Sequence, residues 1–139
     1  MSSIFSKIIA GELPGHFVWR DDRVVAFMTI APIVPGHLLV VPVEEIDHWD
    51  DMPEKLANHC LGVARVISRA QKAVYGCQRV ALQIIGLEVP HTHLHLVPIN
   101  TMEDTDITRA KMAEADALAA EAEKLRAELV DKGFKEARL

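Results

Sequence analysis

Residues 89–98 read Val89-Pro90-His91-Thr92-His93-Leu94-His95-Leu96-Val97-Pro98, with a histidine at every second position from 91 to 95. Successive side chains of an extended strand point to opposite faces. The segment therefore predicts a strand that carries three imidazoles on one face and apolar side chains on the core side. Neighbouring histidines would stand about 6.6–7 Å apart along the backbone, close enough for their rings to serve one small ligand.

The three histidines also constrain what the site can bind. Imidazole titrates near neutral pH, and three imidazoles in one pocket cannot all be cationic. They must lower one another's pKa, or share an anion or a metal ion. The pattern therefore favours a functional site whose occupant is an anionic substrate or a metal.

Composition is that of an ordinary soluble globular chain. The 139 residues are 50% hydrophobic and 25% charged, with a formal net charge of -5. This length predicts a single domain spanning 1–139. No broad basic field is present, so duplex nucleic acid is not an expected partner, while the charge does not exclude a local pocket for one nucleotide. No apolar run approaches the roughly 20 residues that cross a bilayer, so no membrane association is expected.

Cys60 and Cys77 are the only cysteines, and neither belongs to a CxxC pair. This usage indicates reduced thiols and a cytoplasmic protein rather than a disulfide framework.

Hydrophobic periodicity predicts an α+β fold of about five strands in hairpin-like order, with helices inserted. Helical spacing begins at Ile4 and stops at Gly11, while a second, long helix follows an N-cap at Asp51 and ends at Gly76. Strands are expected over 16–20, 23–28, 37–43 and 79–85, followed by a short turn and the antiparallel histidine strand.

A further helix is expected over 106–131, ending at Gly133, within a C-terminal helical extension of about 104–132. Its apolar stripe consists of Leu118, Ala122, Leu125 and Leu129. The stripe is suited to packing on its own domain or on a second subunit, and the sequence leaves both open.

Four blocks in order give the chain a resemblance to the histidine triad (HIT) family of nucleotide hydrolases and transferases. They are residues 4–14, Asp21-Asp22 with Ala26-Phe27, residues 35–42, and residues 91–97, and the similarity runs from about residue 3 to 98. The resemblance implies a HIT-like fold: an antiparallel sheet of about five strands with a long central helix. It also implies a homodimer and a pocket for a nucleoside monophosphate.

The resemblance also implies roles for individual residues. His93 would attack phosphorus and carry a nucleotidyl group, while His91, His95 and His37 would orient it and bind the phosphoryl oxygens. A nucleoside cradle maps onto Phe5, Ile8, Phe27 and Ile30, and the turn before the histidines onto Gly86, Leu87, Glu88 and Val89. This scheme requires neither a metal nor another cofactor.

Several positions depart from the family pattern. Leu87 and Glu88 stand where many members have Gln and then Ser or Thr, which donate hydrogen bonds to the phosphate and the leaving group. Thr29 replaces the usual ribose-binding Asp, and Val80 replaces an Asn. Ser3 and Ser6 occupy the positions of a zinc-binding cysteine pair in some relatives, so that structural metal is expected to be absent.

Three functions therefore stay open. The leading one is a nucleotidyl hydrolase or transferase acting on a phosphoramidate, an acyl adenylate or a dinucleoside polyphosphate through His93. The second is a metal-binding hydrolase in which His37 or Glu88 completes a site on the histidine strand. The third is a non-catalytic nucleotide-binding module, which the four departures make credible although the full set of histidines is retained.

Overall fold

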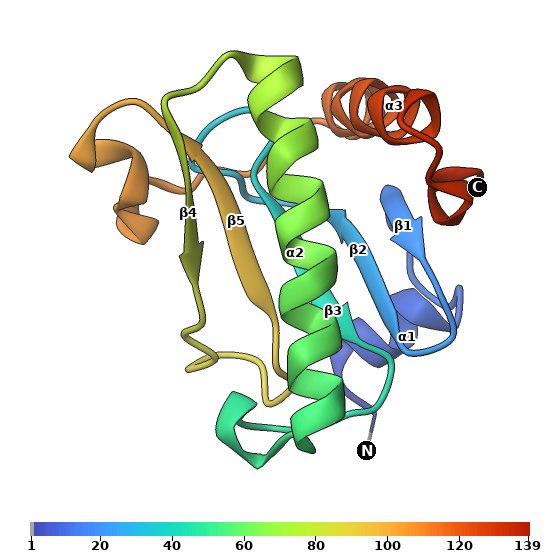
Figure 1. Ribbon diagram of the computed structural model, residues 1–139. Helices are drawn as coiled ribbons and strands as arrows, with labels where there is room; N and C mark the ends of the chain where they lie inside the picture. The colour runs from blue at the N-terminus through green and yellow to red at the C-terminus, as the bar shows by residue number, and fades with distance from the viewer. Residues whose placement is uncertain (1) are drawn as a thin grey trace.

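The computed structural model describes residues 2–139, and its centre is a five-stranded antiparallel sheet (Figure 1). Strands β1 (Phe17–Arg20), β2 (Val24–Met28), β3 (Leu38–Pro42), β4 (Arg79–Gln83) and β5 (Leu94–Ile99) lie in the order β1-β2-β3-β5-β4. All four neighbouring pairs are antiparallel. This arrangement confirms the predicted α+β fold.

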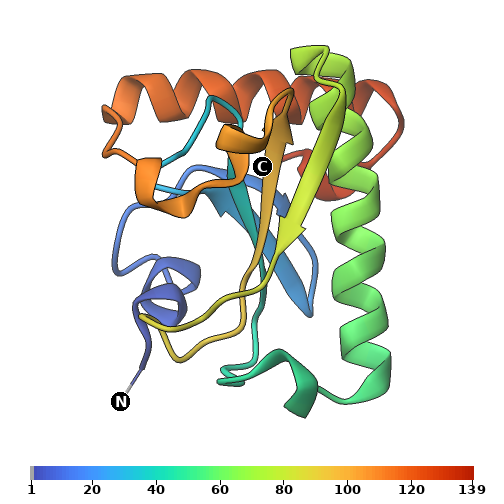
Figure 2. The same cartoon turned by 90° about the vertical axis from the view of Figure 1, so that its left-hand side faces the viewer.

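Helices cover the two faces of the sheet unequally. The long helix α2 (Glu54–Tyr75) lies on one face, the short helix α1 (Ile4–Ile9) lies on the other, and α3 (Ala115–Asp131) crosses one end (Figures 1 and 2). Alternation along β3 separates two cores: Leu38 and Val40 belong to the large cluster under α2 and α3, and Leu39 and Val41 to a smaller one beneath α1.

Helix α2 follows the predicted pattern except at its start. Its buried stripe includes Leu56, Val63 and Ile67, and Gly76 ends it in the left-handed conformation at φ 62°. The predicted N-cap at Asp51 is wrong. Residues Trp49–Asp51 form a 3-10 turn, and Pro53 precedes the first helical residue without a side-chain cap.

Helix α2 also fixes the start of β3. The buried amide of Gln71 donates to the carbonyl oxygens of Gly36 (2.9 Å) and Leu96 (3.1 Å). Gly36 itself has φ 93°, and a Cβ there would overlap the ring of Tyr75. Glycine is therefore required immediately before His37 for two reasons, its backbone conformation and the packing of α2.

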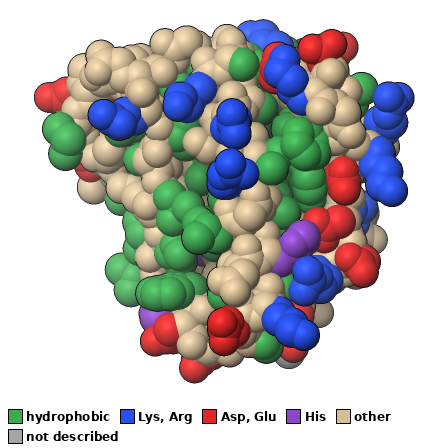
Figure 3. Space-filling model, in the orientation of Figure 1, with side chains coloured by type: hydrophobic (Ala, Val, Ile, Leu, Met, Phe, Trp, Pro, Cys, Tyr) green, Lys and Arg blue, Asp and Glu red, His purple; other side chains and the backbone are tan. Residues whose placement is uncertain are grey.

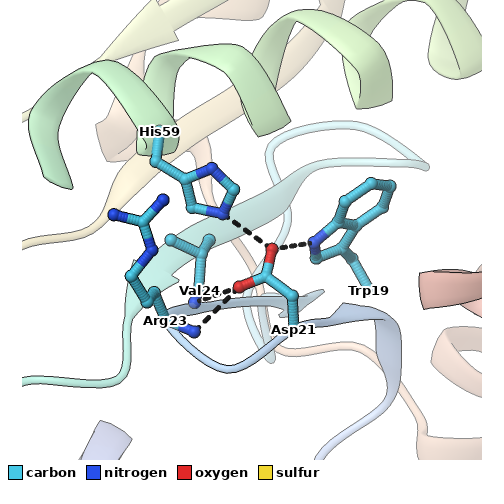
Figure 4. Close-up of polar contacts among 5 residues, drawn as sticks. All are labelled: Trp19, Asp21, Arg23, Val24 and His59. Carbon is cyan, nitrogen blue, oxygen red and sulfur yellow. Dashed lines mark hydrogen bonds and ion pairs between the residues drawn. The ribbon is translucent and has the colours of Figure 1, made fainter. Parts of the chain in front are cut away.

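Asp21 connects the β1–β2 hairpin to α2 (Figure 4). Its Oδ1 accepts from the amides of Arg23 and Val24, both at 2.8 Å, and its Oδ2 accepts from Trp19 Nε1 at 2.9 Å. Nε2 of His59 lies 2.8 Å from the same Oδ2. These contacts give His59 a structural role, since every group on the carboxylate belongs to the hairpin or to α2.

The C-terminal region is less helical than predicted. Met102–Thr105 and Ile107–Arg109 are 3-10 turns, and α3 begins only at Ala115. Carboxylates compete with the helix here, because Asp104 accepts from the amides of Asn100 and Thr101, and Asp106 accepts from that of Thr108. In addition, the amides of Lys111 and Ala113 donate to the carbonyl oxygens of Pro32 and Ile30.

Helix α3 packs on its own chain. The side chains of its predicted stripe are 5% exposed or less and belong to the large core cluster; they are Leu118, Ala122, Leu125 and Leu129. The Tyr75 hydroxyl donates to Glu121 Oε1 (2.8 Å), which joins α2 to α3. Of the two packing partners that the sequence left open, the stripe therefore packs on its own domain.

The outer side of α2 is basic. Arg65, Arg69 and Lys72 are exposed along this helix, and Figure 3 shows Lys and Arg side chains over it.

On the opposite face of the sheet lies His95, which pairs in register with Leu39 and so shares the face of α1 rather than that of α2. Within residues 2–139, no helix is both long and apolar enough to cross a membrane.

Candidate active site

The histidine segment is only partly a strand. Strand β5 begins at Leu94, so His91 and His93 precede it, and residues 84–93 form a connection longer than the short turn expected. The loop after β3 holds this connection: Thr92 donates its amide (2.7 Å) and its hydroxyl (2.8 Å) to the carbonyl of Ile46. The prediction of one continuous strand is wrong because these bonds replace a β ladder at 91–93.

His93 is held with one nitrogen bonded and the other free. Its Nδ1 lies 2.7 Å from the carbonyl oxygen of His91. A carbonyl only accepts, so Nδ1 carries the hydrogen and Nε2 keeps its lone pair. Among residues 2–139, Nε2 of His93 has no protein hydrogen-bond partner. The Phe5 ring lies edge-on to the imidazole with 4.7 Å between centroids, which fixes the plane of the ring.

His37 and His95 form a directed chain of hydrogen bonds. The amide of Ile33 donates to His37 Nδ1 (3.0 Å), so the hydrogen of His37 is on Nε2, which lies 2.9 Å from His95 Nδ1. His95 Nδ1 is therefore an acceptor, and its own hydrogen is on Nε2. The His93 and His95 ring centroids are 5.0 Å apart, so the free lone pair and the N–H donor belong to neighbouring rings.

His91 is fully enclosed, as is His37. It is 0% exposed; Nε2 lies 2.7 Å from the carbonyl oxygen of Pro42 and Nδ1 lies 2.6 Å from the hydroxyl of Ser3. Both ring nitrogens are thus engaged by protein atoms. What His91 presents to the site is its backbone carbonyl, which orients His93.

Burial favours the neutral form of three imidazoles, those of His37, His93 and His95. It lowers the pKa of His37 to about 3 and that of His95 to about 4, and a neighbouring histidine, His95 and His93 respectively, adds to each effect. Burial also lowers the pKa of His93, against the opposing effect of its bond to His91. At neutral pH the site therefore offers a neutral imidazole with a free lone pair, His93, and a neutral N–H donor, His95.

The predicted apolar cradle is only partly assembled. Phe5, Ile8 and Phe27 are packed together in the small core cluster, with Val89 against it. Ile30 is 54% exposed and lies outside this cluster. In the turn 86–89, Leu87 is 90% exposed and Glu88 is also exposed.

The remaining departures from the family pattern have structural surroundings of their own. The Thr29 hydroxyl accepts from the amide of Ala31 at 3.3 Å, within the turn after β2. Val80 lies in β4 and packs against the large core cluster. Their predicted connection with ribose recognition stays a prediction.

The arrangement does not resemble a metal centre. No group of three or more His, Cys, Asp or Glu side chains in residues 2–139 is disposed to hold a metal ion. The reason is visible in the hydrogen bonds: His37 and His91 have both ring nitrogens engaged, and among these four rings only Nε2 of His93 and of His95 lacks a partner in the described residues 2–139. A protein zinc site takes at least three protein ligands.

Sequence reasoning missed three groups that shape the site. They are the Ile33 amide, which sets the tautomer of His37, the Ser3 hydroxyl on His91, and the Glu45 carboxylate, which accepts from the Ser3 amide (2.6 Å). Ser3 could have been found as an N-cap, because serine directly before an apolar helical repeat is a helix-start signal. No sequence signal marks a backbone amide.

Comparison with known proteins gives consistent results. A family model described as the HIT domain matches residues 10–102. The purine nucleoside phosphoramidase of Escherichia coli strain K12 is 36% identical over 104 residues, covering 68% of this chain and 85% of that protein. An uncharacterized HIT-like protein of Methanocaldococcus jannaschii is 36% identical over 99 residues, covering 68% and 77%.

A solved structure extends the likeness over most of the chain. The Hit-like protein involved in cell-cycle regulation from Bartonella henselae superimposes with a TM-score of 0.82 at 28% identity. The match covers 92% of this chain and 96% of that one.

Proposed function

This chain belongs to the HIT family, and from that premise we propose that it is a nucleotidyl hydrolase or transferase acting on a small nucleoside 5′-phosphate derivative through His93. The observation that carries the proposal is the free Nε2 of His93, held by its Nδ1–H bond to the His91 carbonyl beside the N–H of His95. The name of the Escherichia coli relative, purine nucleoside phosphoramidase, supports a phosphoramidate as the first substrate to test.

The proposed reaction has two displacements. Nε2 of His93 attacks the phosphorus, so that a P–N bond forms while the bond to the leaving group breaks and its electron pair departs with that group, which takes up a proton from solvent when it is an amine. Water then attacks the same phosphorus, the P–N bond breaks, and the proton of the water passes to solvent. A different acceptor in place of water gives nucleotidyl transfer.

The other histidines would assist without changing their charge. The Nε2–H of His95 donates to a phosphoryl oxygen, where charge is carried in such transfers, and His37 keeps that hydrogen on Nε2 through its bond to His95 Nδ1. The low pKa of His95 suits a neutral donor. The exposed Leu87 and Glu88 supply no buried donor, so the oxygens depend mainly on His95.

Steady-state assays separate this proposal from the two alternatives. Adenosine 5′-phosphoramidate, an acyl adenylate and a dinucleoside polyphosphate are offered to the wild type, to His93→Ala and to the exposed-loop control His48→Ala. Removing the nucleophile is expected to lower kcat by at least about 10³-fold, and the control should match the wild type. Activity lost on chelation and restored by zinc would favour the metal-binding hydrolase, and nucleotide binding without turnover the non-catalytic module.

A homodimer is also proposed. Strand β4 pairs with β5 alone, so its other edge is free for pairing in residues 2–139, and Leu82 is 41% exposed there. Sedimentation equilibrium tests this assembly. The cytoplasmic location stays a proposal as well, supported by two free, buried thiols, Cys60 and Cys77.

A further inference from the structure

We propose that Ser3 is a positioning residue, and that Ser3, Ser6, Glu45 and His91 form a latch that holds α1 in place and sets the orientation of His93. The effect on rate rests on the proposed function of His93. The latch joins three segments far apart in sequence: the N-terminus, the loop after β3, and the connection before β5.

Ser3 makes two hydrogen bonds through one buried hydroxyl. The side chain is the N-cap of α1 and accepts from the amide of Ser6 at 3.0 Å. Because Nε2 of His91 donates to Pro42, Nδ1 of a neutral His91 is an acceptor, and the Ser3 hydroxyl donates to it at 2.6 Å. The Ser6 hydroxyl, at 3.4 Å, is a poorer target for the same proton.

Glu45 closes the latch from the loop after β3. Its Oε1 accepts from the Ser3 amide (2.6 Å) and from the Ser6 hydroxyl (2.8 Å). These bonds, the Ser3 amide first, hold the pKa of Glu45 below its ordinary value, so the carboxylate is charged at neutral pH. A negative charge at the start of α1 also complements the exposed amides of a helix N-terminus.

Two routes lead from the latch to His93. Helix α1 has six residues, too few to be stable alone, so it depends on its cap and its packing. It carries Phe5, whose ring lies edge-on to the His93 imidazole with 4.7 Å between the ring centroids. The second route is through His91, because loss of the Ser3 hydroxyl leaves a buried nitrogen unpaired in the residue whose carbonyl holds His93 Nδ1–H.

The test compares Ser3→Ala and Glu45→Gln with neighbouring controls, Ser2→Ala and Glu44→Gln, whose side chains are exposed. Long-range ¹H–¹⁵N spectra of the imidazoles report tautomers without substrate. We expect His93 to be the Nδ1–H tautomer in the wild type and both controls, and to show an added Nε2–H population in Ser3→Ala. Glu45→Gln, which keeps a neutral acceptor, should give a smaller change in the same direction.

Kinetics with a nucleoside phosphoramidate supply the second readout. Loss of one hydrogen bond to a buried partner predicts that kcat falls about tenfold in Ser3→Ala. KM should change much less, because the substrate contacts are intact. Ser3→Thr, which keeps the hydroxyl, should restore both kcat and the tautomer of His93.

The outcomes distinguish a latch from ordinary scaffold. A Ser3→Ala protein with a lower Tm but wild-type kcat and His93 tautomer at 25 °C would overturn the proposal, and so would equal effects in Ser2→Ala. If the wild type turned over no nucleotide, the proposed function would fail, while the imidazole spectra would still decide whether Ser3 orients His93.

Discussion

Acidification from pH 7 to pH 5 is expected to destabilise the protein through His37, a buried imidazole whose pKa is lowered to about 3 by burial and by His95. A histidine in an unfolded chain titrates near 6.5. Between those two values the unfolded state binds the proton and the folded state does not, so stability falls as the pH falls below 6.5. Above 6.5 neither state is protonated and the contribution is constant.

The magnitude follows from the two pKa values. At pH 5 a site with pKa 6.5 unfolded and about 3 folded lowers the free energy of unfolding by about 2 kcal/mol relative to pH 7. His37→Asn removes the titrating group and keeps an acceptor for the Ile33 amide. The variant should therefore lose about 2 kcal/mol less than the wild type over this interval.

Urea unfolding at the two pH values, followed by the fluorescence of Trp19 and Trp49, measures both losses. His48→Asn is the control, because His48 should change the stability in the opposite direction as the pH falls. A hydrogen bond to Asp50 raises the pKa of the exposed His48, which therefore stabilises the fold as the pH falls. His48→Asn should therefore lose at least as much free energy of unfolding between pH 7 and pH 5 as the wild type does. Equal losses in His37→Asn and the wild type, within about 0.5 kcal/mol, would refute the account of a neutral, buried His37.

Three further outcomes test other parts of the molecule. Because burial lowers the pKa of His93, the acid limb of kcat/KM should be centred below 6.5, and an acid limb centred at or above 6.5 would contradict a neutral nucleophile. Asp21→Asn places an amide N–H against the donors of Trp19 and His59 and should lower the free energy of unfolding in urea by about 1–3 kcal/mol. The exposed neighbour Asp22→Asn should leave it unchanged. Equal losses in the two variants would exclude Asp21 as the anchor shown in Figure 4. Leu125→Ala, at a 0% exposed position, should cost about 2–5 kcal/mol, while Leu61→Ala, at 56% exposure, should be nearly silent; a silent Leu125→Ala would mean that α3 does not pack on its own chain.

Periodicity located most elements of the fold but not all of their ends. The strands were predictable because burial on one or both faces leaves a pattern in the sequence, as in the fully buried β3. The start of α3 was not, since Asp104 and Asp106 use their carboxylates to form 3-10 turns that helix propensity does not describe. The start of α2 was misplaced for a related reason, because Asp51 lies inside a 3-10 turn.

The histidine site, too, was predictable from the sequence only in part. The alternating residues indicated a shared site, and the structure places His37, His93 and His95 in one continuous group of rings. The division of roles depends on hydrogen-bond partners that the histidine spacing does not reveal: the Ile33 amide for His37, the His91 carbonyl for His93, and Ser3, far away in sequence, for His91. Which nitrogen of an imidazole carries the hydrogen depends on how the folded backbone aims these groups, so it could not be predicted from spacing.

The most direct measurement is a rapid-quench experiment with a nucleoside 5′-phosphoramidate, followed by mass spectrometry of peptides kept at alkaline pH to preserve P–N bonds. If Nε2 of His93 attacks phosphorus, the peptide containing residue 93 gains one nucleotidyl group within the first turnover, and the modification lies on that histidine. Turnover by the wild type with the group on another residue, or full activity in His93→Ala, would contradict the account.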